Sequence, residues 1–171
     1  MTIQIDTREK ARAIKRIVSD FDALGVRHYS SKLFVGDYMN LDNPRVLIDR
    51  KQNLAELCAN VSDVPKKDES GRFKRDSNGR IISERIRFID ELKRAKDAGL
   101  RLIILCEHGG GIKCLEDVAK WKNPRLAVSP LAVSGVRLHK ILSAVSQNYG
   151  VSFEFCDKRN TAKHIISLLG K

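Results

Sequence analysis

The fold is decided by one stretch of the chain, SKLFVGDYMN (31–40), LDNP (41–44) and RVLIDRK (45–51). Two runs rich in β-forming residues flank a polar segment that contains Asn and Pro. This pattern predicts a β-hairpin with its turn near residues 42–44. Residues that pair across such a hairpin have numbers that sum to about 86.

The predicted pairing places Asp37 opposite Asp49. Opposed side chains on one face of a sheet have Cβ atoms about 4.5–5.5 Å apart, and two carboxylates so close repel each other unless a cation, proton or basic group intervenes. Lys51 is two residues beyond Asp49 and shares its face, whereas Arg50 points the other way. Two acids and a lysine suit a hard cation such as Mg²⁺ or Mn²⁺ and phosphodiester hydrolysis. The alternative is a surface hairpin with solvated Asp and Lys.

The remaining pattern predicts strands alternating with helices. We expect strands at 2–6, 100–107 and 151–156, and helices at about 9–24, 54–61, 84–98, 115–121, 136–148 and 161–170. No internal repeat and no domain linker is evident. These elements predict a single α/β domain, residues 1–171, in which the early hairpin makes the central sheet mixed, with helices flanking it.

The composition favours a polyanionic partner. The chain has 32 Lys and Arg against 21 Asp and Glu, a formal charge of +11. Neutralising phosphates releases counterions, so this excess favours nucleic acid, although a merely soluble basic protein would show it too. No run is long enough to span a bilayer, and the N-terminus lacks the apolar core of a signal peptide. We therefore expect a cytoplasmic protein with no membrane partner and no small-molecule substrate.

Three motifs in order resemble the nuclease domain of XPF-type structure-specific endonucleases, in the PD-(D/E)xK superfamily. They are IDTRE (5–9), VGDY (35–38) and IDRK (48–51), and RIRFIDELKRA (85–95) is similar to the family's next helix. The resemblance implies a restriction-endonuclease-like fold and metal-dependent cleavage of branched DNA. The chain ends before any helicase-like or helix–hairpin–helix region, so a minimal stand-alone member from a phage or bacterium, active in an infected or prokaryotic cell, is expected.

The resemblance also implies roles for residues outside the hairpin. Asp6 would be a third metal-binding acid beside Asp37 and Asp49, and Glu9 a further catalytic residue. The alternatives are a helix N-cap for Asp6 and an exposed first-turn position for Glu9. Arg8, Arg50 and Arg87 would contact DNA. Asp49 stands where the family usually has Glu, and the family's helix acid is displaced to Glu56, which puts a catalytic role for Glu56 in doubt.

Residues 62–83 form a polar insertion that we call the basic arm. It is expected to be a long loop or a small hairpin around the DSNG turn at 76–79. Its basic residues would contact DNA, and deleting 64–80 would weaken DNA binding with little loss of fold. The alternative is a solvated loop. The residues concerned are Lys66, Lys67, Arg72, Lys74, Arg75 and Arg80.

These observations predict an Mg²⁺- or Mn²⁺-dependent DNA endonuclease with Asp37, Asp49, Lys51, Asp6 and Glu9 as catalytic residues. The runner-up is a DNA-binding module that has lost catalysis, and RNA cleavage is a third possibility. A homodimer is expected from the resemblance. The helices at 136–148 and 159–170 are the predicted sources of its apolar contact.

Overall fold

The computed structural model describes residues 1–63, 65 and 67–170. Its centre is a six-stranded mixed sheet in the order β2-β1-β3-β4-β5-β6. The strands are β1 (Thr2–Ile5), β2 (Arg27–Ser30), β3 (Tyr38–Asn40), β4 (Asn43–Lys51), β5 (Arg101–Glu107) and β6 (Ser152–Cys156). Antiparallel pairing joins β1 to β3 and β3 to β4, and the other pairs are parallel. The predicted mixed sheet is therefore confirmed, with β2 as a strand that the sequence pattern did not reveal.

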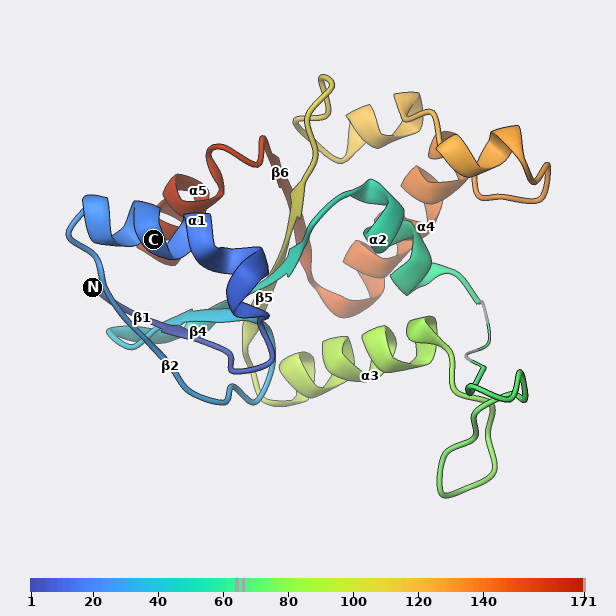
Figure 1. Cartoon of the computed structure of the whole chain (residues 1–171), viewed down its shortest axis with the longest axis horizontal. Coiled ribbons are helices and arrows are strands. Elements are labelled where there is room, and N and C mark those ends of the chain that lie inside the picture. The colour runs from blue at the N-terminus through green and yellow to red at the C-terminus, as the bar shows by residue number, and fades with distance from the viewer. Residues whose placement is uncertain (64, 66, 171) are drawn as a thin grey trace.

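Helices cover both faces of the sheet (Figure 1). The helices α1 (Ala11–Ala23) and α5 (Thr161–Leu169) pack on one face, and α2 (Leu54–Val61), α3 (Glu84–Asp97) and α4 (Gly135–Tyr149) pack on the other. Each face has its own apolar core, because alternate residues of the central strands point to opposite sides. The predicted helix near 115–121 is a 3₁₀-helix, Glu116–Lys120, and a second one follows at Pro124–Ala127.

The hairpin has the register that the sequence predicts. Tyr38 pairs with Ile48 and Met39 with Leu47, so the partner numbers sum to 86 until an irregularity at Asn40. In β4, Leu47 packs in the core on the α2–α4 face, whereas Ile48 packs in the core on the α1–α5 face. This alternation places Asp49 and Lys51 on the α2–α4 side and Arg50 on the α1–α5 side.

The start of α2 fixes the chain just after the hairpin. Asn53 is the N-cap, and its side chain accepts the backbone N–H of Glu56 at 2.8 Å. The Glu56 carboxylate in turn accepts the backbone N–H of Gln52 at 2.7 Å. The first bond satisfies a donor that the first turn of a helix leaves free, and the second holds the residue before the N-cap. Together these bonds hold α2 directly against the end of β4.

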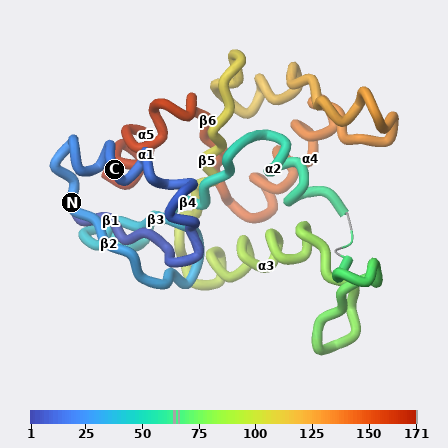
Figure 2. The backbone as a smooth tube through the Cα atoms, in the orientation of Figure 1, coloured from blue at the N-terminus to red at the C-terminus, as the bar shows by residue number. Residues whose placement is uncertain are grey.

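The basic arm extends from the body between α2 and α3 (Figures 1 and 2). It consists of two turns built alike, KDESGRF (67–73) and RDSNGRI (75–81), which is a short repeat that the sequence pattern did not reveal. In each turn the Asp side chain accepts backbone N–H groups two and four residues on, and the Gly has a positive φ of 80° or 77°. Of the loop and the hairpin expected here, the structure has a small hairpin at DSNG, closed by the bridge between Arg75 and Ile81, and a similar one before it, closed by Lys67 and Phe73. The described part of the chain contains no helix long and apolar enough to cross a membrane.

Candidate active site

Asp37 and Asp49 meet where β3 and β4 begin to separate. Asp37 immediately precedes β3, and its backbone N–H donates to the Ile48 carbonyl at 2.7 Å. Its carboxylate accepts the backbone N–H of Arg50 at 2.8 Å, so a side chain replaces the next backbone bond of the ladder. Continuing the register puts Asp37 opposite Asp49, as the hairpin predicts. Burial raises the pKa of Asp37 well above its usual value, and the charges of Asp49 and Glu9 raise it further.

Lys51 is the basic partner of this acidic pair. Its Nζ lies 2.9 Å from Oδ1 and 2.8 Å from Oδ2 of Asp49. Burial alone would lower the pKa of Lys51, but the charges of Asp49, Asp37 and Glu91 outweigh it, so the pKa is raised and the side chain is an ammonium. Its Nζ also lies 5.6 Å from the centroid of the Phe88 ring on α3. The ammonium is therefore held between the acidic pair and the helix.

One oxygen of this cluster has an ion-pair contact but no hydrogen bond. Asp49 Oδ2 is buried and, among the described residues, has no hydrogen-bond partner, although Lys51 Nζ is close enough for an ion pair. A buried carboxylate oxygen without a hydrogen bond is costly. The pKa of Asp37 is raised as well. The single positive charge of Lys51 therefore does not balance the two carboxylates. Such a donor set fits a hard divalent cation.

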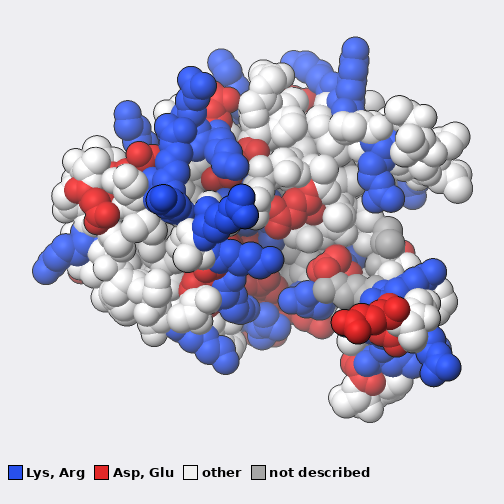
Figure 3. Space-filling view, in the orientation of Figure 1, with Lys and Arg blue, Asp and Glu red and all other residues white. Residues whose placement is uncertain are grey.

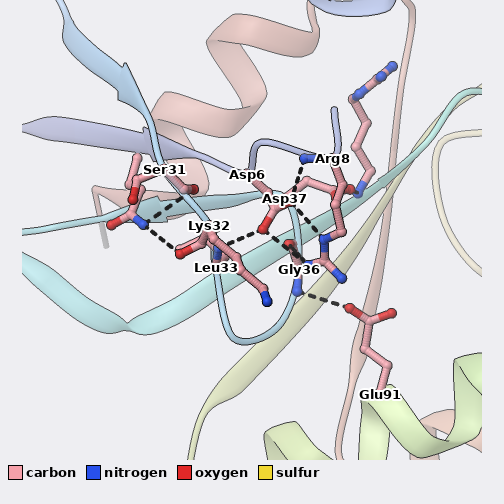
Figure 4. Close-up of polar contacts among 10 residues, drawn as sticks. Asp6, Arg8, Ser31, Lys32, Leu33, Gly36, Asp37 and Glu91 are labelled. Atoms are coloured by element: carbon pink, nitrogen blue, oxygen red, sulfur yellow. Dashed lines mark hydrogen bonds and ion pairs between the residues drawn. The ribbon is translucent and has the colours of Figure 1, made fainter. Parts of the chain in front are cut away.

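Asp6 follows β1 and is held by hydrogen bonds from Leu33 and Arg8. Its buried carboxylate accepts the N–H of Leu33 at 2.6 Å and the backbone N–H and Nε of Arg8, both at 2.7 Å (Figure 4). Burial alone would raise the pKa of Asp6, but these bonds and the Arg8 charge hold it below its usual value. The structure does not bring Asp6 into a metal cluster, since no three acidic, His or Cys residues converge in the described chain. It is not the N-cap of α1 either, because that position is Lys10.

Arg50 and Glu9 belong to a buried ionic network on the α1–α5 face. Arg50 donates to Glu9 Oε2 at 2.7 and 3.0 Å, and its Nη1 lies 3.2 Å from Glu107 Oε2. Glu9 also accepts the Tyr38 hydroxyl, and Glu107 accepts that of Thr161 at the start of α5. The Arg50 side chain is 1% exposed, so the prediction that it contacts DNA is wrong for this structure. All three hydrogen bonds are accepted by Glu9 Oε2, and they tie the hairpin to the segment that leads into α1.

A pocket of about 340 Å³ lies on the α2–α3 side of Lys51. Arg8 and Arg87, both predicted to contact DNA, reach it with 55% and 64% of their side chains exposed. Figure 3 shows acidic side chains in the middle of this face with Lys and Arg around them. The lining residues are Arg8, Lys51, Glu56, Asn60, Glu84, Arg87, Phe88, Asp90, Glu91 and Arg94. Glu56 thus combines its capping role with a place at the pocket.

Glu91 is a member of the site that sequence reasoning missed. From α3, its Oε1 accepts the backbone N–H of Gly36 at 3.0 Å, directly before Asp37 (Figure 4). Gly36 has φ +71°, and a Cβ there would lie 2.9 Å from the Ile48 carbonyl oxygen. Only its position one helical turn after Arg87, on the same helix face, could have suggested Glu91.

The described basic residues of the arm, Lys67 to Arg80, are all exposed. Lys66 falls outside the described residues. The helices proposed for a dimer contact bury their apolar faces in the protein's own cores, Leu138, Leu142 and Val145 on α4 and Ile165 and Leu169 on α5. The structure therefore gives no support to the predicted location of a dimer patch on those faces.

Comparison with known proteins identifies the fold and the family. The chain is similar in structure to XPF from Aeropyrum pernix, with a TM-score of 0.62 and 18% sequence identity over 99% of this chain and 63% of that one. The same protein in complex with DNA matches with a TM-score of 0.60 and 17% identity, at the same coverage. The chain thus spans less than two thirds of those solved structures, and no curated protein sequence matches it. The ERCC4 domain model matches residues 5–169, so the chain belongs to the ERCC4 domain family, and its fold is that of the XPF-type domain.

Proposed function

We propose that this protein is a divalent-metal-dependent DNA endonuclease that acts through Asp37, Asp49 and Lys51. The observation that carries the proposal is the pair of opposed carboxylates, Asp49 buried and Asp37 half-buried, with one lysine in an ion pair with Asp49 and no hydrogen bond to Asp49 Oδ2 among the described residues. Two opposed carboxylates with a single lysine carry a surplus negative charge, and in a purely structural hairpin their repulsion would be a cost with no return. The arrangement is understandable if a cation completes it.

Asp37 and Asp49 would hold Mg²⁺ or Mn²⁺, with the remaining positions left to water and phosphate oxygens. When bound, such a cation lowers the pKa of a coordinated water and offsets charge that develops on the scissile phosphate. Asp6 would be a third ligand. To bind the cation, its carboxylate would have to give up the hydrogen bond from Arg8 to Oδ1 or the one from Leu33 to Oδ2. Glu9 remains proposed as an accessory residue, acting on Asp37 through its charge.

The basic residues of the site would bind and orient the substrate. The raised pKa of Lys51 makes it an ammonium, so it would donate hydrogen bonds to the attacking water or a phosphate oxygen rather than remove a proton. Arg8 and Arg87 line the pocket next to it and carry the planar donor geometry that matches phosphate. These contacts would position the strand without reading its sequence.

The basic arm would add sequence-independent contacts to the DNA backbone. Lys67, Arg72, Lys74, Arg75 and Arg80 are exposed, and the turn aspartates keep the backbone of each turn in place. Deleting residues 64–80 should weaken DNA binding and flatten its salt dependence by about one unit of slope for each phosphate that the arm neutralises. Unchanged affinity across a salt series would contradict this role.

Branched DNA is the proposed substrate and a homodimer the proposed assembly, both on the basis of the XPF-type motifs. One of the similar solved structures is XPF from Aeropyrum pernix in complex with DNA, which supports a nucleic-acid partner for this chain. The competing function is a DNA-binding module without catalysis. No observation favours it, because the three residues of the site are all present and adjacent.

The test is a cleavage assay with labelled duplex, fork, flap and four-way-junction DNA and matched RNA, in Mg²⁺, Mn²⁺ or EDTA. The wild type should cut only with metal, and Asp49→Asn and Lys51→Ala should each lower the rate by roughly a hundredfold or more. Matched controls are Asp42→Asn and Lys93→Ala, whose side chains are 64% and 58% exposed. Cleavage that persists in both site variants would overturn the assignment. Binding without cleavage in any metal would establish the module instead.

A further inference from the structure

The loop of residues 31–37 joins β2 to β3 and leads into the active site. Side chains from two other elements hold its backbone (Figure 4). Gln4 on β1 donates to the carbonyl of Lys32 at 3.2 Å, and Asp6 accepts the N–H of Leu33 at 2.6 Å. At the far end Glu91 on α3 accepts the N–H of Gly36 at 3.0 Å. A connecting loop with this many side-chain anchors is a rigid platform rather than a mobile segment.

This rigid backbone turns alternate side chains inward and outward. Leu33 and Val35 are 5% and 0% exposed and pack into the protein. Phe34, between them, is 64% exposed, and Lys32 is also exposed. The loop therefore packs into the protein through Leu33 and Val35 and leaves the ring of Phe34 in contact with solvent.

The position of Phe34 relates it to the proposed chemistry. It lies three residues before Asp37, and the carbonyl of Gly36 accepts a bond from Arg8, which lines the pocket beside Lys51. The loop therefore carries an exposed cation at Lys32, two residues before Phe34, and a bond from the Arg8 guanidinium at Gly36, two residues after it. An apolar protein partner would need a continuous apolar patch here, whereas a nucleic acid offers phosphates for the cations and a base for the ring.

We infer that Phe34 is a stacking contact for an unpaired DNA base next to the cleaved bond. Aromatic side chains stack on any base because each base has a π-face, and in an intact duplex those faces are covered by neighbouring pairs. The fixed loop removes the cost of ordering the ring on binding. The inference rests on the proposed function and deepens it, since it makes Phe34 the residue that distinguishes branched DNA from continuous duplex.

The test compares binding of a fork with unpaired arms and of a matched continuous duplex, in EDTA, by fluorescence anisotropy. Phe34→Ala should weaken fork binding by roughly tenfold, within the range of about 5- to 150-fold for loss of one stacked base, and leave duplex binding within about twofold. Phe34→Tyr should retain fork binding, and Phe34→Leu should behave like Phe34→Ala. The control Leu131→Ala alters a side chain that is 90% exposed on another loop and should change neither. Circular dichroism melting should show the same fold for every variant.

Several outcomes would overturn the inference. These are an equal loss on both substrates, no loss with Phe34→Ala, full binding by Phe34→Leu, or a change of molar mass in solution for Phe34→Ala, which would assign the ring to a protein interface. Because binding is measured without metal, the result is separate from catalysis. A wild type that cuts forks while Phe34→Ala binds them normally refutes the inference alone, and a wild type that never cuts refutes the proposed function alone.

Discussion

Replacing Arg50 should destabilise the protein strongly, and it tests the view that Arg50 is structural. In Arg50→Met the guanidinium disappears, while the carboxylates of Glu9 and Glu107 remain in place. These side chains are 15% and 1% exposed, and both lie within 3.2 Å of the guanidinium nitrogens in the native protein. Burial by itself lowers the pKa of Arg50, but Tyr38 and Glu9 outweigh it and keep the guanidinium charged. The variant therefore leaves two acids facing each other without their cation.

Removing one partner of a buried ion pair costs about 3–5 kcal/mol. In a domain of this size, 1 kcal/mol shifts the melting temperature by about 2–4 °C, so the expected loss is roughly 6–20 °C. This is a large part of the ~5–15 kcal/mol that stabilises a typical domain. A triple variant, Arg50→Met with Glu9→Gln and Glu107→Gln, removes the unpaired charges and should recover at least about half of the loss.

The measurement is urea denaturation at neutral pH, followed by circular dichroism, with Arg16→Met as the control. Arg16 is 59% exposed and lies 3.8 Å from Asp20, so its replacement should change the free energy of unfolding by less than about 0.5 kcal/mol. A loss below about 1 kcal/mol for Arg50→Met would refute the buried network. So would a triple variant no more stable than the single one.

Three other replacements probe the loop and the helix beside the site. Gly36→Ala should lower the free energy of unfolding by about 2 kcal/mol or more, because φ is +71° and the new Cβ would lie 2.9 Å from the Ile48 carbonyl oxygen. Denaturation measures this loss, and normal stability would contradict the conformation of Gly36. Glu91→Ala should lower the cleavage rate about tenfold. Glu91→Gln can still accept the Gly36 N–H and should largely retain the rate. An equal loss in both variants would assign Glu91 a charge-dependent role instead. Asp6→Ala should lower the free energy of unfolding by about 1–3 kcal/mol, since the Leu33 N–H loses its acceptor. It should leave the Mg²⁺ concentration for half-maximal cleavage unchanged, and a large increase in that concentration would show that Asp6 is a ligand.

The acidic pair was accessible to sequence reasoning because it depends on local geometry. The hairpin signal fixed which residues face each other, and the period of two along β4 put Lys51 beside Asp49 and turned Arg50 away. The helices were equally accessible, since their apolar periodicity is a local property. The strand β2 was not, because it is an edge strand with three of its four residues exposed and has no apolar alternation.

The sequence by itself therefore determined the fold class, the hairpin and the three residues proposed for catalysis. Tertiary structure decided what the other charged residues do. Asp6 and Glu9 lie in the same motif, yet one anchors the 31–37 loop and the other pairs with a buried arginine from β4. Glu91 meets Gly36 across 55 residues of chain. A charged side chain has no periodicity that reveals its partner, because that partner is set by which distant segments the folded chain brings into contact.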